Sequence, residues 1–91
     1  MTYKIDFSKE AEKVIKKWKK SNRPLFEKLR KVLDSIVQTP REGIGHPEAM
    51  KGGNGVTYSR HITAHDRIVY NVFDDIITVV VIDVEGHYND K

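Results

Sequence analysis

The chain contains no cysteine, and no apolar stretch in it approaches the length of a membrane-spanning helix. The lack of cysteine excludes a disulfide framework, a thiolate nucleophile and a cysteine zinc site. A transmembrane helix needs about 20 consecutive apolar residues. The first ten residues, MTYKIDFSKE, also lack the apolar core of a signal peptide. These absences predict a cytoplasmic protein with no membrane partner.

The length allows one domain, residues 1–91, with a modest core and no visible repeat or linker. Its net charge of +3 is unevenly distributed, because residues 1–39 carry +6 and residues 40–91 carry −3. The excess lysines in the first part could attract a nucleic-acid backbone. They could equally be the solvated surface of a helix. Composition leaves both interpretations open.

Local patterns predict the elements of the N-terminal part. Alternating apolar residues predict a short strand over residues 3–7. Ser8 is suited to cap a following helix, whose apolar residues recur at helical spacing as far as Trp18. Asn22 is the next cap, and a second apolar stripe predicts a helix from there to about Gln38. We expect an antiparallel helical hairpin with one apolar seam.

The C-terminal part predicts a loop followed by three strands. Residues 39–55 contain two prolines and five glycines, which favour an ordered loop with no strand. Strands are predicted over residues 56–62, 67–73 and 76–84, and the nearly all-apolar last one should be central and covered on both faces. The order β-α-α-β-β-β predicts an α+β fold, a small, mostly antiparallel sheet with the hairpin on one face.

Three side chains are of the types that cleave RNA without a metal. The reaction needs a base for the 2′-hydroxyl, a cation for the phosphorane and an acid for the leaving 5′-oxygen. Glu48, Arg67 and His87 could supply these groups, and Tyr88 could stack on a base or donate to phosphate. They lie on separate elements, so spacing alone does not show that they converge.

Each of these residues also has an ordinary alternative. Glu48 could be a solvated loop acid, and His87 could be a surface residue near the C-terminus. Arg67 starts a buried strand and needs an anion, which could be a phosphate or one of the carboxylates of Asp66, Asp74 and Glu85.

Two further patterns do not predict a site. His61 and His65 are four residues apart, a metal-binding spacing only on a helix, whereas a strand and a turn are predicted here. The glycine-rich segment 52–55 lacks the lysine and hydroxyl of a phosphate-binding P-loop. We therefore expect neither a metal nor a cofactor.

Three segments together carry a family resemblance: TPREGIGHPEAMKG from Thr39, SRHITAHDRIVY from Ser59 and GHY from Gly86. With them the chain resembles the YoeB/Txe family of mRNA interferase toxins, in the RelE/ParE superfamily. The first segment meets the pattern TPxxGxGxPExLK, with Met50 in place of leucine. The second meets SRRIxxxxRLVY at Ser59, Arg60, Ile62, Arg67, Val69 and Tyr70, with His61 in place of the second arginine.

The resemblance implies a microbial-RNase-like fold and a toxin of a type II toxin–antitoxin system. It implies a ribosome-dependent endoribonuclease that cleaves mRNA in the A site and leaves a 5′-hydroxyl and a 2′,3′-cyclic phosphate or 3′-phosphate. The implied partners are the ribosome, mRNA and a cognate antitoxin, of the YefM/Phd-like or a related kind, whose C-terminal segment wraps the toxin. A homodimer is also implied.

Carried over by position, the resemblance implies that Glu48 is the general base and His87 the general acid. It implies that Arg67 stabilises the transition state and that Tyr88 shapes the site. We expect the groove on the face or edge of the sheet that the helices leave open, with the antitoxin covering or distorting it near Arg67 and His87.

The resemblance also implies three RNA contacts: Lys51, Arg60 and His61. His61 would make a weaker, pH-dependent contact with phosphate than the usual arginine. Glu85 stands near a position that is often basic in the family, and residues 89–91 extend beyond the tyrosine that ends some members. These departures concern the RNA contacts more than the catalytic residues.

Two alternatives belong to other functional classes. A ParE-like toxin would poison a topoisomerase by binding alone, but that subfamily lacks the glutamate, arginine and histidine set. A plain nucleic-acid-binding module would show salt-dependent binding that survives the loss of His87.

Overall fold

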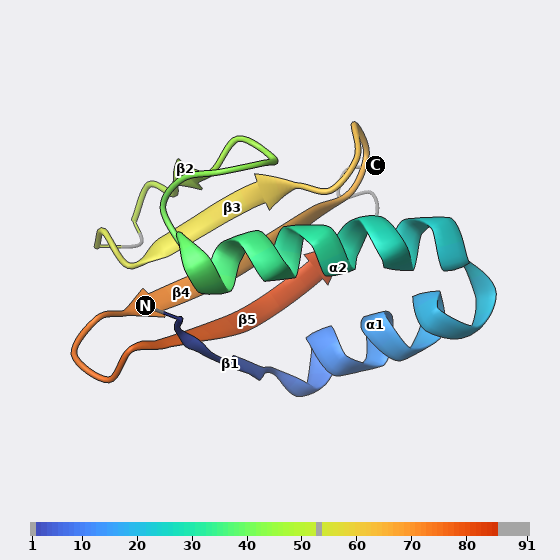
Figure 1. Ribbon diagram of the computed structural model, residues 1–91, viewed down its shortest axis with the longest axis horizontal. Coiled ribbons are helices and arrows are strands. Elements are labelled where there is room, and N and C mark those ends of the chain that lie inside the picture. The colour runs from blue at the N-terminus through green and yellow to red at the C-terminus, as the bar shows by residue number, and fades with distance from the viewer. Residues whose placement is uncertain (1, 53, 86–91) are drawn as a thin grey trace.

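The computed structural model describes residues 2–52 and 54–85. In this part of the chain, two helices cover one face of a five-stranded sheet (Figure 1). The sheet has the order β1-β5-β4-β3-β2, in which β1 and β5 are parallel and the other neighbours are antiparallel. The strands are β1 (Lys4–Phe7), β2 (Glu48–Ala49), β3 (Thr57–His61), β4 (Arg67–Phe73) and β5 (Thr78–Glu85). The predicted α+β fold is confirmed.

Both predicted helices begin at the predicted caps. Helix α1 spans Lys9–Ser21, and the Ser8 hydroxyl accepts a hydrogen bond from the Ala11 amide at 3.0 Å. Helix α2 spans Arg23–Gln38, and the Asn22 side chain accepts from the Leu25 amide at 3.3 Å. Neither helix has the length and hydropathy of a transmembrane segment.

The core lies between the helices and the sheet. Its buried side chains come from α1, α2, β4, β5 and Ile62 just after β3, and each large one stabilises the fold by about 1.5–3 kcal/mol. On β4 the core residues are Ile68, Tyr70 and Val72. Because side chains alternate along a strand, Arg67 and Val69 point to the other face, which neither α1 nor α2 covers. We call it the open face.

The last strand differs from the prediction in two ways. It begins at Thr78, because Ile76 and Ile77 lie in the preceding turn, where Ile77 has a positive φ of 49°. It is also not covered on both faces, since Ile82 is 36% exposed. A register shift pairs Val69 with Asp83 but Tyr70 with Val81, so Ile82 has no register partner on β4. The shift brings both Val81 and Val84 into the core.

The predicted loop over residues 39–55 contains a strand that the sequence did not indicate. Glu48 and Ala49 form β2, which pairs with Ser59 and Tyr58 of β3. The Met50 amide extends this pairing by donating to the Thr57 carbonyl at 2.9 Å. The prediction of no strand was wrong because two exposed residues carry no apolar alternation, and only the neighbouring strand makes them extended.

Candidate active site

Three of the predicted site residues share the open face. Residues paired directly across strands point to the same side of a sheet. Glu48 is paired with Ser59, and Ser59 with Val69, so Glu48 lies on the face to which Val69 points. His61 is paired with Arg67, two residues further along both strands. Glu48, His61 and Arg67 therefore occupy one surface.

The strand register sets the spacing between Glu48 and Arg67. The residues are two strands apart and offset by two residues along the strand. Strands lie about 4.8 Å apart and two residues advance about 6.7 Å, so the two Cα atoms are about 12 Å apart. Extended glutamate and arginine side chains can both reach a phosphate placed between them. Glu48 is exposed and Arg67 is half-buried.

One of the alternative partners proposed for Arg67 lies far from it. Asp74 follows the opposite end of β4, where it accepts hydrogen bonds from Arg41 and Tyr3. The carboxylate of Asp66 accepts from the Thr63 hydroxyl at 2.5 Å.

Strand β5 ends beside Arg67. Glu85, the last residue of β5, is the register partner of Arg67. His87 and Tyr88 lie outside the described residues.

Lys51 is exposed in the turn after β2, three residues beyond Glu48. Over residues 2–52 and 54–85, no group of three or more histidine, cysteine or acidic side chains could hold a metal ion.

Arg60 is not at the RNA-binding surface, contrary to the prediction. It is only 1% exposed, and it lies on the core side of β3, between Ser59 and His61 of the open face. Its guanidinium donates to five acceptors: the hydroxyls of Tyr70 and Ser35 and the carbonyls of Thr39, Glu42 and Ile44. A buried charge needs such partners, and they leave it unavailable to RNA.

These contacts hold residues 39–45, which we call the 39–45 loop, against β3 and the end of α2. Tyr70 takes part twice, because its hydroxyl accepts from Arg60 at 2.9 Å and donates to the Pro40 carbonyl at 2.6 Å. Burial raises the pKa of Tyr70 despite the opposing effect of Arg60. The hydroxyl therefore stays protonated at neutral pH and can donate.

A second, exposed contact ties the same loop to the turn between β4 and β5. Arg41 makes a bidentate pair with Asp74, at 2.8 and 3.2 Å, and lies 5.7 Å from the ring centre of Tyr58. The Tyr3 hydroxyl donates to the same carboxylate at 2.6 Å. The hydrogen bonds from Arg41 and then from Tyr3 lower the pKa of Asp74.

This contact predicts an acid-sensitive contribution to stability. The pKa of Asp74 is lower in the folded protein, so its contribution is complete above the unfolded pKa of about 3.9. It is lost as the pH falls through the folded value. Melting temperatures measured between pH 6 and pH 2 (roughly the range of carboxylate titration) should therefore fall more steeply for the wild type than for Asp74→Asn. Asp75→Asn, at an exposed neighbour, should keep the wild-type dependence, and equal slopes for wild type and Asp74→Asn would contradict the assignment.

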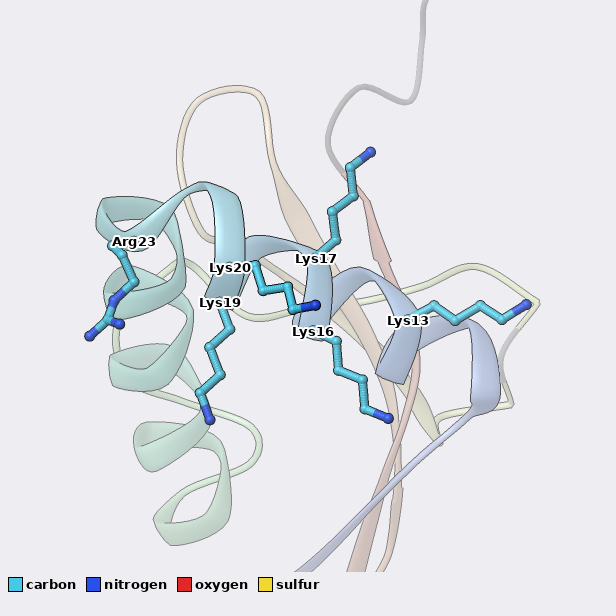
Figure 2. Close-up of a pocket in the computed structure, with 6 residues that line it drawn as sticks. All are labelled: Lys13, Lys16, Lys17, Lys19, Lys20 and Arg23. Atoms are coloured by element: carbon cyan, nitrogen blue, oxygen red, sulfur yellow. The ribbon is translucent and has the colours of Figure 1, made fainter.

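A cationic surface lies on α1 and the start of α2. Figure 2 shows the side chains spreading outward from the helix into the solvent. The residues that line it are Lys13, Lys16, Lys17, Lys19, Lys20 and Arg23. All six are exposed, and none forms a salt bridge with a described carboxylate. We call it the α1 basic surface; it belongs to the helical layer, whereas Glu48 and Arg67 lie on the open face.

Comparison with known proteins decides the family. A family model described as the YoeB-like toxin of bacterial type II toxin–antitoxin systems matches residues 7–88. The chain belongs to this family. Toxin YoeB of Streptomyces coelicolor is 31% identical over 71 residues, which cover 78% of this chain and 82% of that protein. Toxin YoeB of Escherichia coli K12 is 32% identical over 62 residues, covering 68% and 74% respectively.

Solved structures agree with this YoeB-like assignment. A YoeB/ParE toxin from Agrobacterium tumefaciens has a TM-score of 0.85 and 29% identity, covering 93% of this chain and 99% of that one. The YoeB dimer from Staphylococcus aureus has a TM-score of 0.83 and 30% identity, covering 97% and 100%. The Staphylococcus toxin is also known in a heterotetrameric complex with YefM (TM-score 0.81, 30% identity, covering 97% and 100%). The chain is a YoeB-family toxin of a type II toxin–antitoxin system.

The sequence did not indicate two polar features on the open face of this YoeB-like chain. Ser59, only 6% exposed, is the register partner of Glu48. The Thr57 hydroxyl donates to the Asn71 side-chain oxygen at 2.6 Å, which fixes the amide between β3 and β4. Thr57, Ser59 and His61 share this face because side chains alternate along a strand, but alternation does not show their partners.

Proposed function

We propose that this toxin is a ribosome-dependent endoribonuclease that cleaves mRNA in the A site by metal-free acid–base transesterification. The observation that carries the proposal is the shared open face of Glu48 and Arg67, about 12 Å apart by the register. A carboxylate and a guanidinium at this spacing can approach one phosphodiester from two sides. Glu85, two residues before His87 in the sequence, is the register partner of Arg67.

The reaction assigns one step to each group. Glu48 takes the proton from the 2′-hydroxyl, whose oxygen then attacks the adjacent phosphorus. Arg67 donates to the non-bridging oxygens, where negative charge grows in the phosphorane. His87 gives a proton to the departing 5′-oxygen, which leaves a 5′-hydroxyl and a 2′,3′-cyclic phosphate.

The remaining residues bind and orient the RNA. Tyr88 stacks on a base or donates to the scissile phosphate, and Lys51 holds that phosphate from the turn after β2. His61 is directly opposite Arg67, where paired residues have Cβ atoms about 4.5–5.5 Å apart, so its imidazole adds a second donor to the neighbouring backbone.

The activity is tested on purified ribosomes programmed with a defined mRNA. We expect cleavage in the A-site codon with a 5′-hydroxyl at the downstream fragment, and a loss on the order of 100-fold in His87→Gln. Undiminished cutting by His87→Gln would reject the acid, and equally fast cutting of free mRNA would reject ribosome dependence. Intact translation together with DNA damage on expression would favour the ParE-like alternative.

The α1 basic surface supports a large RNA partner, because it lies in a different layer from the proposed catalytic residues. Lys19→Gln/Lys20→Gln should weaken ribosome binding, measured by co-sedimentation, and make the log–log salt slope about one unit shallower per lost phosphate contact. The matched control is Lys28→Gln/Lys31→Gln, an equal charge change on exposed positions of α2. Equal losses in the two variants would argue against a local RNA contact.

The same family relationship supports a YefM-like antitoxin as the partner of this chain, and a homodimer as its free state. We expect the antitoxin segment to cover or distort the open face near Arg67 and His87. A structure of the complex that left Arg67 accessible and correctly placed would show that inhibition works in another way.

A further inference from the structure

Arg60 is a buried cation that forms no salt bridge with any carboxylate of the described residues. The salt bridges between described residues join Glu27 to Arg30 and Arg41 to Asp74, and all five acceptors of Arg60 are neutral. Hydrogen bonds from an ionised donor are stronger than those between neutral groups. The hydrogen bonds of this guanidinium therefore hold the surrounding backbone in place.

That backbone is the 39–45 loop. Arg60 donates to the carbonyls of Thr39 at 2.6 Å, Glu42 at 2.8 Å and Ile44 at 3.1 Å. The Tyr70 hydroxyl links the guanidinium to a fourth carbonyl, that of Pro40. Four of the six residues from 39 to 44 are thus held by Arg60 directly or through Tyr70.

The loop also fits closely against β3. Gly43 and Gly45 have φ values of +119° and +85°, which residues other than glycine rarely adopt. A Cβ atom at Gly45 would lie 2.5 Å from the His61 carbonyl oxygen. The His61 amide in turn donates to the Gly45 carbonyl at 2.7 Å. The loop therefore contacts β3 at a fixed position along the strand, at His61.

Glu48 depends on this anchoring because its own strand is short. It follows Gly45 by three residues, and β2 consists of two exposed residues. On β3, Arg60 faces the core, while Ser59, the partner of Glu48, faces the other way. The same strand thus holds the loop from the core side and pairs with Glu48 at its edge.

We propose that Arg60 is a positioning residue which, through the 39–45 loop, sets where Glu48 stands on the open face. This inference rests on the proposed role of Glu48 as general base. Arg60 therefore has a role inside the molecule, distinct from contact with RNA.

The test compares Arg60→Lys and Tyr70→Phe with a control that weakens the core elsewhere, Val79→Ala. Displacement of the general base Glu48 mainly lowers kcat. On programmed ribosomes we therefore expect kcat to fall on the order of 10-fold in Tyr70→Phe and 100-fold in Arg60→Lys. KM should stay within about threefold. Val79→Ala, assayed below its melting temperature, should keep the wild-type kcat. If kcat follows melting temperature equally in all three variants, the inference is overturned.

A double-mutant cycle separates positioning from a general structural role. In a Glu48→Gln background, Tyr70→Phe should cause no further loss of kcat, because it acts through the missing carboxylate. The same fold-loss in both backgrounds would refute the inference. Should Arg60→Lys fail to fold, Tyr70→Phe alone decides, since it removes one hydroxyl and keeps the ring.

Amide hydrogen exchange tests the inference without any activity. Tyr70→Phe should speed exchange in residues 39–49 by about tenfold or more and leave α1 unchanged. Unchanged exchange in residues 39–49 would overturn the inference, even in a protein that cleaves. If the wild type does not cleave on ribosomes, the proposed function fails, and the exchange result still decides whether Arg60 holds the loop.

Discussion

Glu48→Gln should reduce single-turnover cleavage on programmed ribosomes by about 10²–10⁴-fold, the usual contribution of a general base. The amide keeps the shape of the carboxylate but cannot take the proton from the 2′-hydroxyl. Glu48 is exposed, and its pairing among the described residues is the backbone register with Ser59 of β3, so the substitution should leave the melting temperature nearly unchanged. A loss of activity would then reflect the chemical step and not a loss of folded protein.

The matched control for this prediction is Glu12→Gln, the same change at an exposed position of α1. It should cleave at the wild-type rate. A Glu48→Gln protein that cleaves within about threefold of the wild type would remove Glu48 from the mechanism, because even a weak general base contributes more than that.

Arg67→Gln should lower kcat by about 10²–10³-fold, comparable to the removal of one donor to a developing oxyanion. The phosphorane carries its extra charge only in the transition state, so KM should change far less than kcat. The kcat of Arg67→Lys should lie between those of the wild type and Arg67→Gln, because lysine retains the charge but not the two parallel donors of the guanidinium.

Arg30→Gln provides the control for Arg67, since it removes the same charge from an exposed position on α2 where the side chain pairs with Glu27. Circular dichroism and melting curves should show that Arg67→Gln is folded. A variant order other than wild type, lysine, glutamine would mean that Arg67 does not stabilise the transition state.

The helices were predictable because their determinants are local. The cap residues Ser8 and Asn22 bond to amides three residues later, and the apolar stripes involve residues three or four apart. The alternation of β3 and β4 was predictable for the same reason, and it gave the correct faces of Arg67 and Tyr70. These features need no knowledge of distant parts of the chain.

The site was predictable only in part. Residue types and the resemblance indicated Glu48 and Arg67 as functional residues, but nothing local showed that Glu48 belongs to a strand. Its place on the open face follows from pairing with Ser59, eleven residues away in the chain. Arg60 was wrongly assigned to RNA because the assignment came from the resemblance, and nothing local showed that its side chain is buried on the core side of β3. Its five acceptors lie 10 to 25 residues away.

By itself, the sequence determined the two helices with their caps, the alternating faces of the middle strands and the segments that mark the family. The tertiary structure alone decided the edge strand with Glu48, the unpaired Ile82 of β5 and the burial of Arg60. The physical reason is that a strand edge or a buried guanidinium is stabilised by partners from distant segments. The free energy of those contacts depends on how much water the whole fold excludes.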